Sequence, residues 1–121
     1  MESYTVLLAE KDPTVARSLG TSLDAHCRAV KIVHSFDELK SAIPRTRADA
    51  IIVDLETVPL NHVATLSRES QLPVVCIHRV PDDKLWTEAL EAGAVDVCRN
   101  YDVPSMIRAI AQTRPGGIQA A

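Results

Sequence analysis

The sequence lacks an excess of positive charge, a long apolar run and a targeting segment. Its 13 Lys and Arg residues are outnumbered by 16 Asp and Glu residues, for a formal net charge of −3, so the electrostatic signature of a dedicated DNA-binding domain is absent. No apolar run approaches the roughly 20 residues of a membrane-spanning helix. The N-terminus has neither the basic region nor the apolar stretch of a signal peptide. We therefore expect a cytoplasmic protein that binds neither a membrane nor nucleic acid directly.

The cysteines form no disulfide or zinc motif. Cys27, Cys76 and Cys98 are odd in number, and no two are spaced as C-x-x-C, which argues against a disulfide framework and a structural zinc site. Cys76 and Cys98 lie inside apolar runs, where free cysteines are commonly buried. We expect small buried side chains at both positions and no nucleophilic cysteine.

Length and composition fit one folded domain. The chain has 121 residues, of which 46% are hydrophobic and 24% charged, which is typical of a globular domain and unlike a disordered chain. Four Gly and seven Pro exclude collagen-like material. We expect one domain over residues 1–114, followed by a flexible tail or the start of a linker over residues 115–121. The chain could therefore be a fragment of a longer protein.

Short apolar runs alternate with helix-like segments five times along the chain. The runs are rich in Val and Ile, which favours strands. Helix starts are indicated by Asp12 directly before Pro13 and by Asp102, and the third helix, about Leu60–Ser70, has the least clear start. This alternation predicts an α/β fold, a doubly wound five-stranded parallel sheet with five helices on its two faces. The expected strands are Thr5–Ala9, Ala29–Val33, Ala50–Val53, Val74–Ile77 and Val95–Cys98.

Polar residues directly follow four of the strands. In an open parallel sheet, functional residues gather beyond the carboxyl ends of the strands. Asp54 stands out because it follows a fully apolar strand, where an uncommitted carboxylate is costly. The other residues at these positions are Glu10, Lys11 and Asp12 after the first strand, His78 and Arg79 after the fourth, and Arg99, Asn100 and Tyr101 after the fifth.

Four segments together resemble the receiver domain of bacterial two-component response regulators, over about Tyr4 to Thr113. They are VLLAEKDP (6–13), ADAIIVDL (48–55), LPVVCI (72–77) and ALEAGAVD (89–96). The resemblance implies the flavodoxin-like (βα)5 fold of the chemotaxis regulators, with strand order 2-1-3-4-5. It also implies a place in two-component, or phosphorelay, signal transduction.

The resemblance assigns roles to the polar residues. In that family an aspartate at the end of the third strand accepts a phosphoryl group from a histidine kinase, and here this residue is Asp54. An acidic pair after the first strand holds Mg²⁺, which neutralises charge during the transfer. A Thr or Ser after the fourth strand and a Lys after the fifth bind the phosphoryl oxygens. An aromatic residue on the fifth strand passes the signal to the face formed by the fourth helix, the fifth strand and the fifth helix.

The sequence departs from the family pattern at most of the supporting positions. Lys11 stands where the direct Mg²⁺ ligand is expected, His78 stands at the hydroxyl position and Asn100 at the Lys position. Tyr101 replaces the proline that follows, and Val97 replaces the switch aromatic. These changes indicate an atypical, degenerate member.

Glu10 and Asp54 are the two carboxylates left for a metal site. Because Mg²⁺ is held largely by carboxylates and Lys11 adds a repelling charge, we expect weak or absent Mg²⁺ binding and no other cofactor. We hypothesise that Lys11 forms a permanent ion pair with Asp54; the alternative is that its side chain extends into solvent. We expect His78 to be hydrogen-bonded to Asp54 or to a backbone carbonyl rather than to ligate a metal.

The sequence thus favours a degenerate receiver domain that is not an enzyme. We expect it to bind a histidine kinase, another signalling protein or a second copy of itself through the face of the fourth helix, fifth strand and fifth helix, with weak or no phosphorylation of Asp54. Trp86, Val97 and Tyr101 are the candidate contact residues, although Trp86 could instead only pack on its own helix.

Two alternatives stay open. A working receiver, phosphorylated on Asp54, could regulate transcription through a C-terminal output domain outside this sequence. More remotely, the chain could be a flavodoxin-like protein that binds a flavin or nucleotide. The loop over residues 10–13 disfavours this reading, because it is acidic, has no Gly and contains a Pro that removes an N–H.

Overall fold

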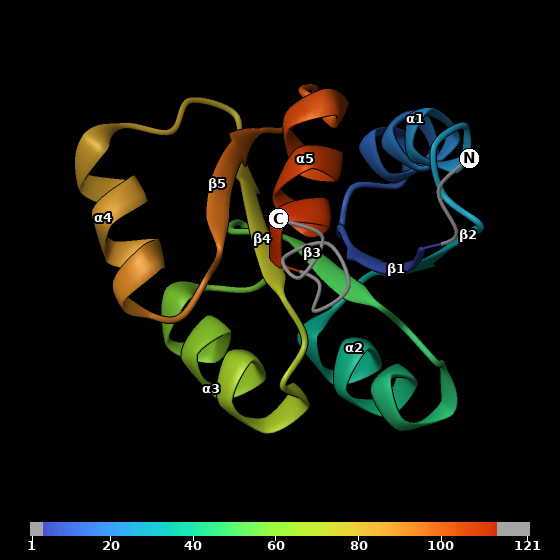
Figure 1. The fold of residues 1–121 in the computed structure, drawn as a ribbon, viewed down its shortest axis with the longest axis horizontal. Coiled ribbons are helices and arrows are strands. Elements are labelled where there is room, and N and C mark those ends of the chain that lie inside the picture. Colours follow the sequence, from blue (N-terminus) through green and yellow to red (C-terminus); the bar gives the residue numbers. More distant parts are fainter. Residues whose placement is uncertain (1–3, 114–121) are drawn as a thin grey trace.

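The computed structural model describes residues 4–113, which form a five-stranded parallel sheet flanked by helices (Figure 1). The strand order is β2-β1-β3-β4-β5, as the resemblance implies. The expected tail over residues 115–121 lies outside the described residues. The strands are β1 (Thr5–Ala9), β2 (Ala29–Val33), β3 (Ala50–Asp54), β4 (Val74–His78) and β5 (Asp96–Arg99). The helices are α1 (Pro13–Asp24), α2 (Phe36–Ala42), which continues into a 3₁₀ turn (Ile43–Arg45), α3 (Leu60–Ser70), α4 (Asp83–Glu91) and α5 (Val103–Thr113).

Helices cover both faces of the sheet, as predicted. On one face, Ile52 of β3 lies in a buried apolar cluster with Leu19 of α1 and Met106 of α5. On the other face, Ile51 lies in a second cluster with Leu39 of α2 and residues of α3 and α4. Figure 1 shows α1 and α5 on one side of the sheet and α2 and α3 on the other. None of the helices within residues 4–113 is long and apolar enough to cross a bilayer.

Four strand ends each differ by one residue from the expected ones. β3 includes Asp54, β4 includes His78, and β5 begins at Asp96 rather than Val95 and ends at Arg99. The reason is that the backbone ladder continues through these residues although their side chains are polar. The sheet itself therefore positions Asp54 and His78, which the sequence analysis placed just beyond the strands.

The helix starts follow the capping chemistry of the sequence. The Asp12 carboxylate accepts hydrogen bonds from the backbone N–H groups of Thr14 and Val15, and Pro13 occupies the first turn of α1. α3 spans the expected residues but begins after Pro59 without a side-chain cap. The missing cap explains why its start was the least clear in the sequence.

α4 has the fewest buried residues of the five helices. The Asp82 carboxylate caps it by accepting the Leu85 N–H at 2.8 Å, and Ala89 is its one buried residue. The helix ends before Gly93, which has a φ of 106° that L side chains rarely adopt. A Cβ atom on Gly93 would lie 2.6 Å from the Ser67 hydroxyl oxygen.

Cys76 and Cys98 are buried free thiols, as expected. Burial raises the pKa of each thiol to about 12. Because the thiolate is the nucleophilic form, neither side chain is set up for covalent chemistry at neutral pH.

Candidate functional site

β1 and β3 end side by side and bring two carboxyl groups together. Ala9 pairs with Val53 in the parallel ladder, and Glu10 and Asp54 directly follow this pair. The two side chains are 3% and 6% exposed, and they are the buried charged residues of the part of the chain that the structure describes. The fold thus places the acceptor-like aspartate and the remaining acid of the expected metal site next to each other.

The Glu10 carboxyl group is buried and has a raised pKa. Its Oε2 atom accepts the Asp12 N–H at 3.2 Å, whereas Oε1 is buried and receives no hydrogen bond from a donor group within residues 4–113. Burial raises the pKa of Glu10 to about 8, with a hydrogen bond to Asp54 as the next cause. The raised pKa favours the neutral form of Glu10 beside Asp54.

A tight turn after β3 orients Asp54. The Asp54 Oδ1 atom accepts the Glu56 N–H at 2.8 Å, and the Asp54 carbonyl accepts the N–H groups of Thr57 and Val58 at 2.8 and 2.9 Å. The turn places the Thr57 hydroxyl where it accepts the Lys11 backbone N–H at 2.9 Å. This hydrogen bond therefore joins the loop that follows β1 to the loop that follows β3, next to Glu10 and Asp54.

The ion pair expected between Lys11 and Asp54 is absent, and that hypothesis is wrong. Lys11 is exposed, in line with the alternative that its side chain extends into solvent. The ion pair near the pocket is instead Arg79 Nε to Glu56 Oε2 at 3.4 Å, on the surface. The physical reason is that Asp54 already has the Glu10 carboxyl group and the Glu56 N–H as partners, while the Lys11 ammonium keeps its hydration.

His78 is held by its own loop. Its Nδ1 atom accepts the Val80 backbone N–H at 3.1 Å, so the neutral ring carries its proton on Nε2. This differs from the expected hydrogen bond to Asp54 or to a carbonyl. The chain turns sharply after β4, and the turn brings the Val80 N–H to the imidazole. The backbone of Asn100 joins the same region by donating its N–H to the His78 carbonyl at 3.1 Å.

Asn100 and Tyr101 line a hollow against α1. Its volume is about 350 Å³. Asn100 makes no side-chain hydrogen bond to Asp54 within residues 4–113 and, unlike a lysine, carries no charge. The other lining residues are Thr14, Val15, Ser18, Leu19, Ser22 and Val103.

The residues around Asp54 do not fit a Mg²⁺ ion. Mg²⁺ requires near-octahedral oxygen coordination, in protein sites with one or two carboxylates. Here Glu10 and Asp54 are the two carboxyl groups at the site, and Lys11 stands at the third position. No set of three His, Cys, Asp or Glu side chains among residues 4–113 is arranged to hold a metal ion. Two carboxyl groups beside a lysine are therefore a poor donor set for a divalent cation.

Exposed apolar side chains lie on and beside the surface that we call the α4–β5–α5 face, which comprises these three elements and the loop before α4. The exposed large hydrophobic residues of the described chain are Val80, Trp86 and Tyr101, at 73%, 47% and 68% exposure. Val97 is 9% exposed and lines a groove together with Trp86. The predicted contact residues Trp86 and Tyr101 are therefore accessible, whereas Val97 is not.

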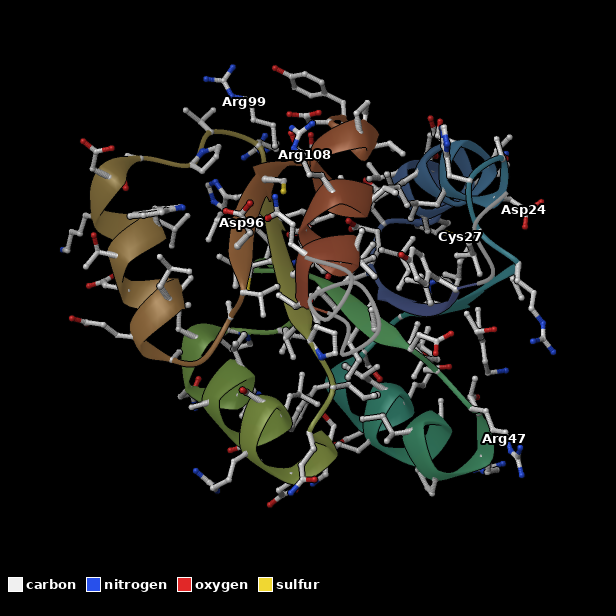
Figure 2. The ribbon with its side chains drawn as sticks, viewed as in Figure 1. Asp24, Cys27, Arg47, Asp96, Arg99 and Arg108 are labelled. Atoms are coloured by element: carbon white, nitrogen blue, oxygen red, sulfur yellow. The ribbon has the colours of Figure 1, made fainter. Side chains whose placement is uncertain are left out.

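Polar contacts fix the side chains of this face. The Trp86 Nε1–H donates to Asp96 Oδ1 at 3.3 Å, and the Arg99 Nη1–H donates to the Tyr101 hydroxyl at 3.2 Å. Figure 2 shows Asp96, Arg99 and Arg108 gathered around β5 and α5. Val80 and Asp96 were not among the contact residues predicted from the sequence. The one available signal for Val80 was an apolar residue in a loop otherwise made of polar residues and proline.

Comparison with known proteins identifies the fold. No family model and no curated protein matches the sequence. The structure is similar to the RcsB response regulator of Salmonella typhimurium, with 16% identity and a TM-score of 0.80 over 93% of this chain; this chain spans 60% of the length of that one.

Two further solved structures agree. A Burkholderia pseudomallei response regulator with a phosphorylated aspartic acid, calcium ion and citrate has 21% identity and a TM-score of 0.78, over 98% of this chain and 72% of that chain. The orphan response regulator HP1043 of H. pylori has 18% identity and a TM-score of 0.76, over 89% of this chain and 97% of that chain. The fold of this chain is therefore that of a response-regulator receiver domain.

Proposed function

We propose that this chain is an atypical receiver domain of two-component signalling, which acts by binding other proteins and not by Mg²⁺-dependent phosphorylation of Asp54. The observation that carries the proposal is that Glu10 and Asp54 are buried side by side, while Lys11 at the metal position is exposed to solvent. The domain has no catalytic activity of its own in this proposal. Its partner is a histidine kinase or another signalling protein.

The pocket argues against efficient phosphoryl transfer. Such a transfer needs cations that offset the charge of the phosphoryl oxygens and of the attacking carboxylate. The metal position has lost its second acid, and the lysine position holds Asn100. The His78 ring is held by the Val80 N–H in its loop. A phosphoryl group on Asp54 would therefore have few compensating partners.

The α4–β5–α5 face supports binding to a protein. Exposed Trp86 and Tyr101, together with Arg99, are of the residue types that dominate the energetics of protein interfaces. A second copy of the chain and a different protein are both compatible with this face.

The alternative is a receiver that is phosphorylated and drives an output domain outside this chain. It is favoured by the retention of Asp54 at the end of β3 and by the turn that presents it. A solved structure of this fold carries a phosphorylated aspartic acid. The two hypotheses predict different responses of the domain to Mg²⁺ and to a phosphoryl mimic.

The test is an NMR amide titration of the 121-residue chain with Mg²⁺, followed by beryllofluoride, which mimics an acyl phosphate. We expect no saturable shift around Asp54 at millimolar concentrations. The Lys11→Asp variant, which restores the missing acid, should gain Mg²⁺-dependent shifts at Asp54 and in the loop after β1. The double variant Lys11→Asp, Asp54→Asn is the matched control and should lose them. Saturable wild-type shifts that spread from Asp54 to α4 and α5 would establish the phosphorylated alternative.

A further inference from the structure

A groove separates α4 from β5 on the α4–β5–α5 face. It has a volume of about 390 Å³, within the range of side-chain and small-ligand sites. Pro81, Trp86 and Val97 line it. The remaining lining residues are Asp82 and Asp83. The groove therefore combines an aromatic and apolar lining with two carboxylates at its rim.

The indole of Trp86 is fixed in orientation. Its Nε1–H donates to Asp96 Oδ1, and the same oxygen accepts the Val97 backbone N–H at 2.8 Å. The side chain stays 47% exposed while its polar atom is bound. Because the indole is the best aromatic platform for a cation, a fixed and accessible ring favours a positively charged group in the groove.

The charges around the groove also favour a positively charged group. Asp82 uses Oδ1 to cap α4 through the Leu85 N–H, and neither Asp82 nor Asp83 has an ion-pair partner within residues 4–113. From Asp82 to Glu91 the segment carries four acidic residues and one lysine. The nearby arginines are engaged elsewhere: Arg79 pairs with Glu56, and Arg99 contacts Tyr101. The rim thus offers unpaired carboxylate oxygens to a cation from outside.

We propose that this groove binds an arginine side chain carried by an exposed basic segment of a partner protein. The guanidinium stacks on the indole of Trp86 and donates to the carboxylates of Asp83 and Asp82. Arginine fits better than lysine because its planar group both stacks on an aromatic face and pairs with carboxylates in a fork. The inference rests on the proposed function, in which this face binds proteins, and it adds the chemistry of the partner.

A second copy of the chain is the competing occupant. Arg108 on α5 is exposed and could enter the groove of another molecule, but it already donates to the Ser105 hydroxyl at 3.0 Å. Arg99 is likewise held by Tyr101. Charge complementarity therefore favours a basic segment from a different protein.

The experiment uses the single tryptophan of the 121-residue chain, Trp86, as its own reporter. The probes are three capped peptides of sequence Gly-Ser-X-Ser-Gly, with X as arginine, lysine or citrulline, which is the neutral isostere of arginine. We expect a saturable change of tryptophan fluorescence with the arginine peptide, several-fold weaker affinity for the lysine peptide, and no binding of the citrulline peptide. Equal responses to arginine and citrulline would overturn the proposal.

Two variants distinguish binding at a specific site from non-specific electrostatic attraction. Asp83→Asn removes one charge from the rim and should weaken the arginine peptide about three- to fivefold. Glu88→Gln removes the same charge from the exposed surface of α4 outside the groove and should leave the affinity unchanged. Circular dichroism melting of both variants shows whether α4 stays folded. Equal losses in the two variants would reduce the binding to non-specific electrostatics and overturn the proposal.

The outcome is independent of the phosphorylation test. Beryllofluoride-dependent shifts would refute the proposed function while leaving the peptide result intact, and a missing peptide response would refute the arginine site alone. A concentration-dependent dimer that dissociates in Asp83→Asn and in Arg108→Gln would assign the groove to a second copy and overturn the proposed occupant.

Discussion

Glu10 and Asp54 lie side by side where β1 and β3 end, and burial next to Asp54 raises the pKa of Glu10 to about 8. The raised pKa favours the neutral form of Glu10, which lowers the repulsion between the two acids. The arrangement has a measurable cost and a measurable pH dependence, because the pKa of Glu10 differs between the folded and unfolded chain.

Stability should fall as pH rises from about 4.5 to about 8. Glu10 has a folded pKa of about 8 against 4.5 for a free glutamate, so between these values the folded chain binds more protons than the unfolded one. The stabilising contribution is complete below pH 4.5 and is lost as pH rises through 8. The loss is on the order of a few kcal/mol, measured by urea denaturation at pH 5, 7 and 9.

Glu10→Gln isolates this effect, because glutamine resembles the protonated acid and does not titrate. The difference in unfolding free energy between this variant and the wild type should shift in favour of the variant from pH 5 to pH 9. The exposed Glu91→Gln serves as the control and should follow the wild type at every pH. Parallel pH profiles for wild type and Glu10→Gln would show that Glu10 titrates normally.

Thr57→Val should loosen the link between the loops after β1 and β3. The Thr57 hydroxyl accepts the Lys11 N–H, and valine keeps the shape but removes the acceptor. We expect a loss of about 1 kcal/mol in unfolding free energy and faster hydrogen exchange at the Lys11 amide. Thr87→Val, on the exposed surface of α4, controls for the substitution itself. An unchanged exchange rate at Lys11 would contradict the predicted link.

Two glycines should respond differently to alanine. Gly93→Ala combines a φ of 106° with a clash against the Ser67 hydroxyl, and should cost about 1–3 kcal/mol. In Gly20→Ala the new Cβ meets only the Cδ1 end of Ile32, at 2.9 Å. The gain in helix propensity, about 1 kcal/mol, should offset that contact. Thermal unfolding of both variants decides the order, and an equal or larger loss at Gly20 would refute it.

Cys76 and Cys98 should resist a thiol-reactive disulfide reagent while the protein is folded. Burial holds the pKa of both thiols near 12, so the reactive thiolate is scarce at pH 8. In a Cys27→Ala background, which leaves these two thiols, we expect rapid labelling only when guanidinium unfolds the chain. Fast labelling of native protein would show that one of the strands opens locally.

The arrangement of strands and helices could be predicted from the sequence because apolar spacing and caps determine it locally. Asp12 and Pro13 mark the start of α1, and Ala50–Val53 is apolar throughout because β3 is covered on both faces. Strand ends were less accurate, since the backbone ladder continues through polar residues such as His78. Side-chain polarity reports burial and gives no direct information on backbone pairing.

The site was harder to predict, because its chemistry depends on contacts between distant segments. Asp54 could be singled out from its position after an apolar run. The orientation of the Lys11 side chain could not be predicted, because its backbone N–H is bound by a threonine 46 residues away. The raised pKa of Glu10 arises from burial by the folded sheet, and the hydrogen bond from Trp86 to Asp96 joins a helix to a strand. None of these has a local signal in the sequence.

The shallow anchoring of α4 has a consequence for how this domain can diversify. With Ala89 as its one buried residue, most of the helix surface contributes little to folding, so substitutions there carry a low risk of unfolding the domain. Natural or designed substitutions on α4 can therefore change which partners it binds with little effect on the packing of the core. The same scaffold can acquire new specificities by changing a single helix.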